Sequence, residues 1–341
     1  MFMERPNYID YAKAFCIFLV VLGHYTYYLG IDFKPSPIWY LMHTITLFHI
    51  PCFFIISGLL HKQQCFKDTI AKVWVQLIRP YFLMSAICLL IMGSLGWISG
   101  DISVKDVVVN VFGIASAGDF LGFQSEYSSP LWFLWALALI KICASTSKYS
   151  KVGGLIFTLL GIIVLYRGNF LPFRIDSASV GFLFFMLGYK LKSMIKYLFN
   201  NNYVAIVTMM ISLLLLALSA SVNLDYTQRQ CLSINACYFG GYPVLFLLSG
   251  ISGTLLVLAI SKLIEFIKLK LILLISNGTI IILGFQKIIY LSLFKGWMHS
   301  ATIEAALLVA LCILFLCCMI IVIASKKAPI LLGNRKIIKN V

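Results

Sequence analysis

The chain has 341 residues, of which 61% are hydrophobic and 11% are charged, and its mean hydropathy is +0.98. A soluble domain is about half apolar and about a quarter charged, so this composition excludes a soluble enzyme and indicates a polytopic membrane protein. The formal net charge of +15 does not indicate a nucleic-acid partner. Its basic residues are distributed between loops as membrane topology requires, so membrane lipid is the expected surrounding.

Apolar segments long enough to cross a bilayer recur along the whole chain. We predict an all-α fold, a bundle of about ten transmembrane helices. The predicted spans are residues 9–29, 38–60, 73–97, 130–144, 152–166, 177–195, 203–222, 242–264, 271–293 and 302–324. They make a single domain over 1–341, with the bundle at 1–324 and a basic cytoplasmic tail at 325–341.

The lysines and arginines between the spans predict the orientation. With the N-terminus inside, the inner segments hold 17 of these residues and the outer segments hold 6. Both termini are therefore predicted to be cytoplasmic. The longest outer segment, residues 98–129, contains Glu126, a carboxylate suited to a sugar hydroxyl.

The ten cysteines lie mostly within apolar runs, where a thiol behaves as a small hydrophobic group. No CxxC pair with a histidine partner occurs, so no metal site is predicted. Cys231 and Cys237 share a predicted outer loop, and the sequence leaves open whether they form a disulfide or stay reduced.

The first predicted span carries three polar residues, Asp10, Lys13 and His24. At 100° per residue, Lys13 and His24 lie within about 20° of each other, and Asp10 lies about 40° from His24. One helical stripe thus holds an acid, a base and an imidazole, and it must face a protein interior or a wet cavity. The histidine is suited either to general-base catalysis or to a satisfied structural role.

Two further spans hold polar residues inside apolar sequence. His49 and Ser57 lie in the second, where His49 could equally be a polar partner for a neighbouring helix and Gly58 permits close helix packing. Arg79 lies in the third, after a loop with Lys67 and Lys72. Arginine at this depth either extends its side chain to the interface or binds an anion such as a phosphate.

These elements together resemble the acyltransferase 3 family. The resemblance rests on the basic-x10-His pattern of Lys13 and His24, on His49 followed by Ser57-Gly58, on Arg79-Pro80-Tyr81, and on Leu131-Trp132-Phe133-Leu134. Members of this family are integral-membrane O-acyltransferases that modify bacterial surface glycans. The first span is most similar to the fucose 4-O-acetylase-like branch.

The chain departs from the family pattern at three positions. The basic residue of the first helix is usually arginine, and here it is Lys13. A pair of arginines three residues apart is frequent before the Pro-Tyr element, but here Gln76 precedes Arg79. Relatives often carry a late histidine, whereas here Asn277-Gly278-Thr279 leads to Gln286, so no role for that histidine carries over.

The resemblance implies an enzyme of the bacterial inner membrane that moves an acyl group, by default acetyl from acetyl-CoA, to a hydroxyl of a lipid-linked or polymeric glycan. No other cofactor is implied. Catalysis is expected at His24 with Lys13 and Asp10. Donor binding is expected at Arg79, Lys72 and Lys67, and a pore or acceptor site at His49, Ser57, Trp132 and Glu126. The alternative is a proton-coupled transporter or flippase of lipid-linked glycans, because buried Asp, Lys and His suit a carrier equally.

Overall fold

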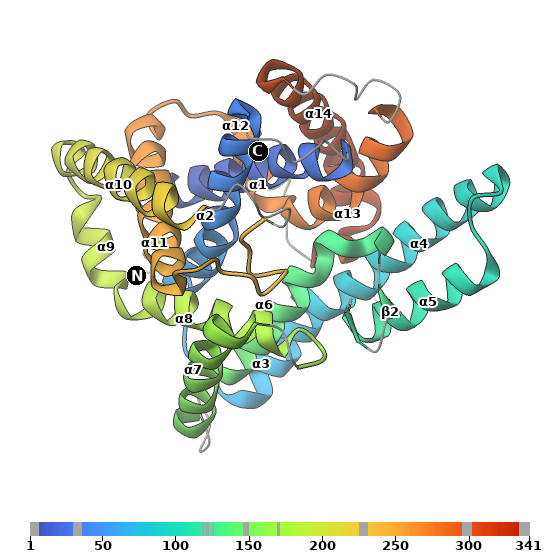
Figure 1. Ribbon diagram of the computed structural model, residues 1–341, viewed down its shortest axis with the longest axis horizontal. Coiled ribbons are helices and arrows are strands. Elements are labelled where there is room, and N and C mark those ends of the chain that lie inside the picture. Colours follow the sequence, from blue (N-terminus) through green and yellow to red (C-terminus); the bar gives the residue numbers. More distant parts are fainter. Residues whose placement is uncertain are drawn as a thin grey trace.

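Helices make up most of the residues that the computed structural model describes (Figure 1). The structure describes residues 7–29, 36–117, 119–120, 123–124, 126–145, 150–168, 171–224, 231–294 and 302–333. The first half comprises α1 (Asn7–Leu29), α2 (Pro37–Leu59), α3 (Phe66–Val73), the π-helix η1 (Trp74–Ile78), α4 (Arg79–Ser99), α5 (Val104–Ala115), strands β1 (Asp119–Phe120) and β2 (Phe123–Gln124), the 3-10 segment η2 (Glu126–Leu131) and α6 (Trp132–Cys143). The second half comprises α7 (Ser150–Arg167), α8 (Ile175–Lys190), α9 (Lys192–Leu198), α10 (Asn202–Asn223), α11 (Pro243–Ile264), α12 (Lys270–Asn277), α13 (Thr279–Ile289), the π-helix η3 (Tyr290–Phe294), α14 (Ile303–Lys327) and the 3-10 turn η4 (Pro329–Leu332).

The all-α prediction is confirmed apart from the two-residue strands, which pair antiparallel. Within the described residues, six helices are long and apolar enough to cross a membrane, and eight spans result if each of two bent pairs counts as one. The predicted number of about ten is not confirmed. The fifth predicted span forms α7, which is not among these helices, and the fourth forms α6. That helix has 12 residues, about 18 Å, which is short of a bilayer core of about 30 Å.

The two bent pairs are α8 with α9, at 63°, and α12 with α13–η3, at 81°. The larger bend falls at Gly278, between Asn277 and Thr279. A Cβ atom at Gly278 would lie 2.2 Å from Ile321 Cδ1 of α14, so only glycine permits this close packing at the bend. The predicted span 271–293 is therefore a broken helix rather than a straight one.

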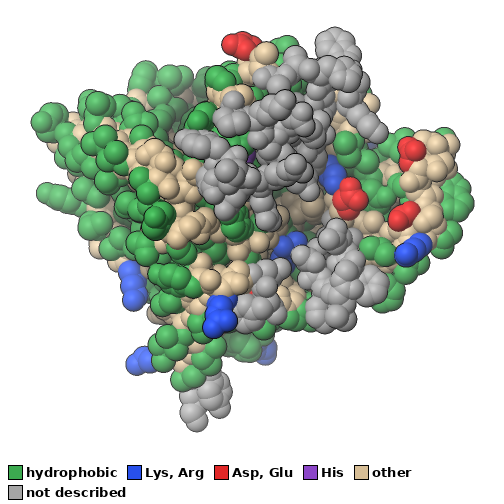
Figure 2. Space-filling model, viewed as in Figure 1, with side chains coloured by type: hydrophobic (Ala, Val, Ile, Leu, Met, Phe, Trp, Pro, Cys, Tyr) green, Lys and Arg blue, Asp and Glu red, His purple; other side chains and the backbone are tan. Residues whose placement is uncertain are grey.

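Three helices form the centre of the bundle, and the others surround them. The apolar windows of α1 and α2 are 67% and 72% buried, and α11 packs against both. The apolar window within the continuous segment from α3 to the end of α4 is only 17% buried, and the window within α10 is 28% buried. Many apolar side chains remain exposed on these outer helices, and hydrophobic side chains are spread over the described surface in Figure 2, as expected for contact with lipid.

The segments predicted to lie on the cytoplasmic side meet at one end of the bundle. The backbone N–H of Tyr8 donates to Glu265 after α11, and the Tyr8 ring packs on Phe199 after α9. His61, after α2, packs edge-on against Tyr189 of α8. These contacts agree with the alternation of loops, while the side of the membrane that this end faces stays a prediction.

The segments predicted to lie outside also meet one another. Arg174, before α8, donates to the carbonyls of Ala117 and Asn235, both at 3.1 Å. Nearby, α4 and α5 form a hairpin that extends to the right in Figure 1. The second helix of this hairpin, α5, starts at a capping box between Ser103 and Asp106. The hydrogen bonds from Ser103 lower the pKa of the Asp106 carboxyl.

Cys231 and Cys237 are free thiols in the structure. The Cys231 Sγ atom lies 3.5 Å from His43 Nε2. Burial raises the pKa of the Cys231 thiol to about 11. Cys237 is buried, and its thiol donates to the carbonyl of Ile234. The alternative in which these two thiols form a disulfide is therefore not the observed one.

The predicted basic tail starts inside the bundle. Ser325 belongs to α14, and η4 then packs against α4. Gly333 has φ of 66°, and a Cβ atom there would lie 2.9 Å from the carbonyl oxygen of Gln76. The rest of the tail, residues 334–341, lies outside the described part of the chain.

Candidate active site

Asp10 and Lys13 both meet Ser276, the residue just before the bend between α12 and α13. Lys13 Nζ donates to the Ser276 carbonyl at 2.8 Å and to its Oγ at 3.1 Å. The Ser276 hydroxyl in turn donates to Asp10 Oδ1 at 2.5 Å. The acid and the base of the predicted stripe thus share one fully buried partner, and they fix the first helix against the bend.

His24 lies farther along the same stripe and faces α13. Its Nδ1 atom is 3.3 Å from Gln286 Oε1, so the Nδ1–H tautomer donates to the amide oxygen. The imidazole is only half-buried although it lies deep within α1, whereas Gln286 is fully buried. The late position that carries glutamine in this chain is therefore in direct contact with the histidine of the first helix.

His49 approaches the same place from α2. It is buried, it lies close enough to His24 for the two rings to interact electrostatically, and its Nδ1–H donates to the Ile45 carbonyl at 2.7 Å. Ser57 lies near the end of the same helix and is half-buried. Ser57 precedes Gly58, which packs on α8. It lies eight residues after His49, which is more than a helical turn along α2.

The helix that carries Gln286 is held by contacts on three sides. Cys88 of α4 donates to the Gly284 carbonyl at 3.3 Å. Lys287 Nζ donates to the Glu126 carbonyl of η2 at 2.5 Å and lies 3.7 Å from its carboxylate. Tyr290 donates to the Val21 carbonyl of α1 at 2.7 Å. These contacts fix the rotation of α13, so the Gln286 amide is aimed at α1.

Glu126 and Trp132 lie on the outer side of this centre. The Glu126 side chain is 71% exposed beside Lys287, where it is open to a ligand. Trp132 is buried, and the guanidinium of Arg174 lies over its ring at 5.8 Å from the centroid. Trp132 therefore supports the outer face, with one side of its ring covered by Arg174.

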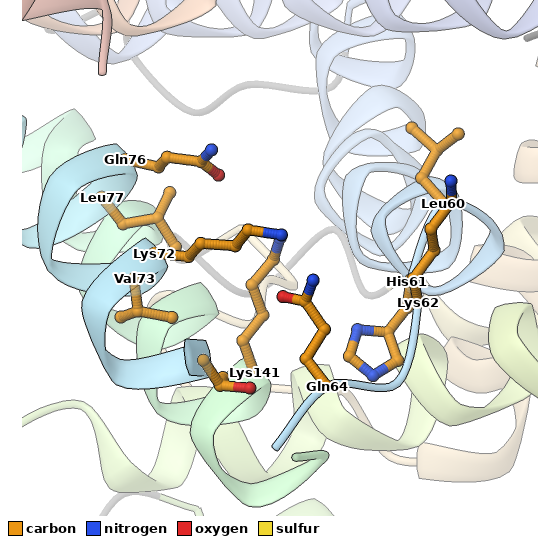
Figure 3. Close-up of a pocket in the computed structure, with 10 residues that line it drawn as sticks. Leu60, His61, Lys62, Gln64, Lys72, Val73, Gln76, Leu77 and Lys141 are labelled. Carbon is orange, nitrogen blue, oxygen red and sulfur yellow. The ribbon is translucent and has the colours of Figure 1, made fainter. Parts of the chain in front are cut away.

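A cavity of about 180 Å³ opens at the predicted cytoplasmic end, between the loop after α2, the α3–η1 segment and the end of α6. In Figure 3, the side chains of Lys72 and Lys141 extend into it from different helices, and the Gln64 amide lies between them and His61. The ten described residues that line it include no carboxylate: Leu60, His61, Lys62, Gln64, Thr69, Lys72, Val73, Gln76, Leu77 and Lys141.

The charge of this cavity comes from its lysines. Burial, and then the positive charges of Lys141 and Lys192, lower the pKa of His61, so its imidazole is neutral at neutral pH. Three lysines and two amides without an acid attract anions, and phosphate groups are the anions that such donors bind well. The cavity is suited to the phosphate end of a ligand that enters from this side.

Of the three predicted donor-binding residues, only Lys72 lines the cavity. Lys67 is exposed on α3. Arg79 begins α4 about two turns after Lys72, and its Nε and Nη2 atoms are buried without a hydrogen-bond partner among the described residues. An unpaired buried guanidinium is costly, so Arg79 is ready to bind an anion that reaches past the cavity.

Sequence reasoning missed Lys141, His61 and Gln64, because each lies at the end of an apolar helix or in a short loop. It also missed Ser276, which has no chemical signature of its own. The motif Asn277-Gly278-Thr279 was the available signal, since a glycine within a predicted span marks a bend. No group of three metal-ligating side chains occurs among the described residues.

The nodulation protein NolL of Mesorhizobium japonicum is 30% identical to the chain over 160 residues, which is 43% of this chain and 38% of that protein. The chain thus matches well under half the length of this relative. No solved structure matches the chain significantly. A family model described as an acyltransferase domain, Acyl_transf_3, matches residues 7–324. The chain, a multi-pass membrane protein by its apolar helices, therefore belongs to the acyltransferase 3 family.

Proposed function

We propose that the protein is an O-acetyltransferase of the bacterial inner membrane, which moves acetyl from acetyl-CoA to a hydroxyl of a surface glycan. The observation that carries the proposal is the contact of His24 with Gln286 in the centre of an acyltransferase domain. A half-buried imidazole can take a proton from a hydroxyl nucleophile. The acceptor is a lipid-linked or polymeric glycan such as an O-antigen or exopolysaccharide sugar.

The donor site that we propose extends from the lysine cavity toward His24. The phosphates of acetyl-CoA bind Lys72 and Lys141, and Arg79 binds a phosphate or carbonyl of the donor deeper in the protein. From Arg79, α4 continues to Cys88, which contacts α13 two residues from Gln286. Leu77 lines the cavity, and Cys88 follows it by eleven residues, which is about 16 Å along a helix. An extended donor can therefore follow α4 from the cavity toward α13.

The reaction needs a base, a positioned donor and an exit for the thiolate. His24 removes the proton of the acceptor hydroxyl as its oxygen attacks the thioester carbonyl. The carbon–sulfur bond then breaks, and the imidazolium returns its proton to the CoA thiolate. Lys13 and Asp10 act through Ser276, which they hold at the bend, and Glu126 offers an exposed carboxylate to the acceptor sugar.

The test is the ester content of the surface polysaccharide. Proton NMR of glycan from cells with the gene is expected to show an acetyl methyl signal that mild alkali removes. Glycan from cells without the gene is expected to lack it. Unchanged acyl content in the two strains contradicts the proposal, and a longer alkali-labile chain would identify another acyl group.

The bend at Gly278 favours one other function, a carrier for lipid-linked glycans. Broken helices with charged residues beside the break are a feature of secondary transporters, and here Asp10 and Lys13 lie beside an 81° bend. Loss of the gene would then lower the amount or chain length of exported glycan and leave its ester content unchanged. The same polysaccharide preparation therefore distinguishes the two functions.

The lysine cavity gives a prediction for the donor. The double variant Lys72→Ala/Lys141→Ala removes two positive charges from an anion site, and the Michaelis constant for acetyl-CoA is expected to rise about tenfold or more. The maximal rate changes little, because neither lysine contacts the reacting carbonyl. The measurement is transfer from labelled acetyl-CoA in inside-out vesicles. Lys151→Ala, an exposed lysine on α7, is the matched control. An unchanged Michaelis constant in the double variant places the donor elsewhere.

A further inference from the structure

Gln286 is the polar residue of α13 whose bonding is incomplete. Its side chain is fully buried between apolar neighbours such as Ile282 and Ile289. Its Oε1 atom is 3.3 Å from His24 Nδ1, but its Nε2 atom has no hydrogen-bond partner among the described residues. Buried amide donors are nearly always paired, so an unpaired one beside a half-buried histidine indicates a group that arrives with substrate.

The surroundings of the amide keep it pointing toward His24. Gly284, Lys287 and Tyr290 fix α13 against α4, η2 and α1, so the side chain does not depend on a flexible loop for its position. The other ionisable groups that face His24 are Lys287 on α13 and His49 on α2. Lys287 is engaged by Glu126, and His49 donates its Nδ1–H to Ile45. The Gln286 amide is therefore the neutral donor available to a reacting carbonyl.

We propose that Gln286 is a catalytic residue whose Nε2–H donates a hydrogen bond to the carbonyl oxygen of the acyl group. This inference rests on the proposed acetyl transfer. The acceptor oxygen bonds to the carbonyl carbon while His24 takes its proton, and the carbonyl π electrons move to the oxygen. Gln286 stabilises that oxyanion. When the carbonyl re-forms, the carbon–sulfur bond breaks and the thiolate takes the proton from His24.

The amide thus contributes through both of its ends. Its oxygen accepts from His24 Nδ1–H, which makes Nε2 the unprotonated nitrogen of the neutral ring, and the proposed mechanism places the hydroxyl proton there. Its nitrogen belongs to the same amide group and therefore also lies near the ring. The base must reach the proton of the attacking oxygen, and the oxyanion donor must reach the carbonyl oxygen. Both oxygens are bonded to the same carbon during the reaction, so an amide in contact with the base meets this requirement.

Two substitutions that both remove the amide donor test its role in a rate measurement. Gln286→Met has a similar shape and removes both amide atoms, while Gln286→Glu keeps an acceptor and removes the donor. Both are expected to lower the maximal rate of transfer from labelled acetyl-CoA in inside-out vesicles about 10²-fold or more, with little change in the donor Michaelis constant. Ile282→Val, a packing change on the same helix, is the control and keeps its rate. Full activity in Gln286→Glu overturns the donor role.

A binding measurement tests the contact without turnover. Infrared difference spectra of carbonyl-labelled acetyl-CoA are compared between His24→Ala and His24→Ala/Gln286→Met. The thioester carbonyl band is expected at lower frequency when Gln286 is present, because a hydrogen bond weakens the carbonyl bond. The same band position in both proteins overturns the inference. Failure of acetyl-CoA to bind either protein contradicts instead the proposed function, so the two failures are distinguishable.

Discussion

Replacing His24 with alanine is expected to lower acyl transfer by about 10²- to 10⁴-fold, which is the contribution of a positioned general base. The protein should stay in the membrane, because the side chain is half-buried and the hydrogen bond to Gln286 that this variant loses is worth about 1 kcal/mol. The measurement is alkali-released acetate from surface glycan, normalised to the amount of protein in the membrane fraction.

A second membrane histidine provides the matched control for this experiment. His43 is buried on α2, stacks on Trp39 with 3.8 Å between ring centroids, and donates from Nδ1 to the Trp39 carbonyl. It has the same chemistry as His24 but lies against Cys231 of the outer loop. His43→Ala is expected to retain most of the activity per folded protein. Full activity in a well-expressed His24→Ala variant would remove His24 from the mechanism.

The first helix was readable from sequence because helical periodicity is a local property. Lys13 and His24 return to one face after eleven residues, and the structure directs both toward the α12–α13 segment. The partners, Ser276 and Gln286, follow some 260 residues later, and no local rule connects them to α1. Sequence thus located the polar face of α1 and left unknown what it faces.

The number of spans could not be predicted in the same way. Hydropathy registers an apolar run, but it does not distinguish a helix that crosses from one that stops, as α6 does after 12 residues. It also did not reveal that α3, η1 and α4 run continuously from Phe66 to Ser99. Pro80 lies just after the π-helix η1, where its missing N–H leaves a carbonyl of the preceding turn without its helical partner.

The proposed donor site shows a related limit of sequence-based prediction. Lys72 was found because it follows a short basic loop, but Lys141 lies in an apolar helix and contributes only because α6 ends beside α3. Lys67 lies on the same helix, five residues before Lys72, but it does not line the cavity. Charge pattern identifies the side on which an anion is attracted. Which of several lysines converge is decided by tertiary packing.

The largest effect on folding is expected for Gly58, which was predicted to permit close packing and does so. A Cβ atom at Gly58 would lie 2.0 Å from the Phe185 carbonyl oxygen of α8, and one at Gly188 would lie 2.1 Å from the Ile55 carbonyl oxygen of α2. Both obstacles are backbone atoms, which cannot rotate away. Gly58→Ala must therefore separate α2 from α8, at a cost of about 3 kcal/mol, the upper range for overpacking.

The measurement is the midpoint of thermal unfolding of the purified protein in detergent, with Gly93→Ala as the matched control. Gly93 is also a helical glycine, on α4, but a Cβ atom there meets nothing within 4 Å, so alanine should be neutral or stabilising by up to about 1 kcal/mol. Since Gly58→Ala and Gly188→Ala widen the same helix pair, the double variant should cost less than the two single losses together. Equal midpoints for Gly58→Ala and Gly93→Ala would show that the two helices are not closely packed in the membrane protein. Strict additivity would instead show that the two contacts are relieved independently.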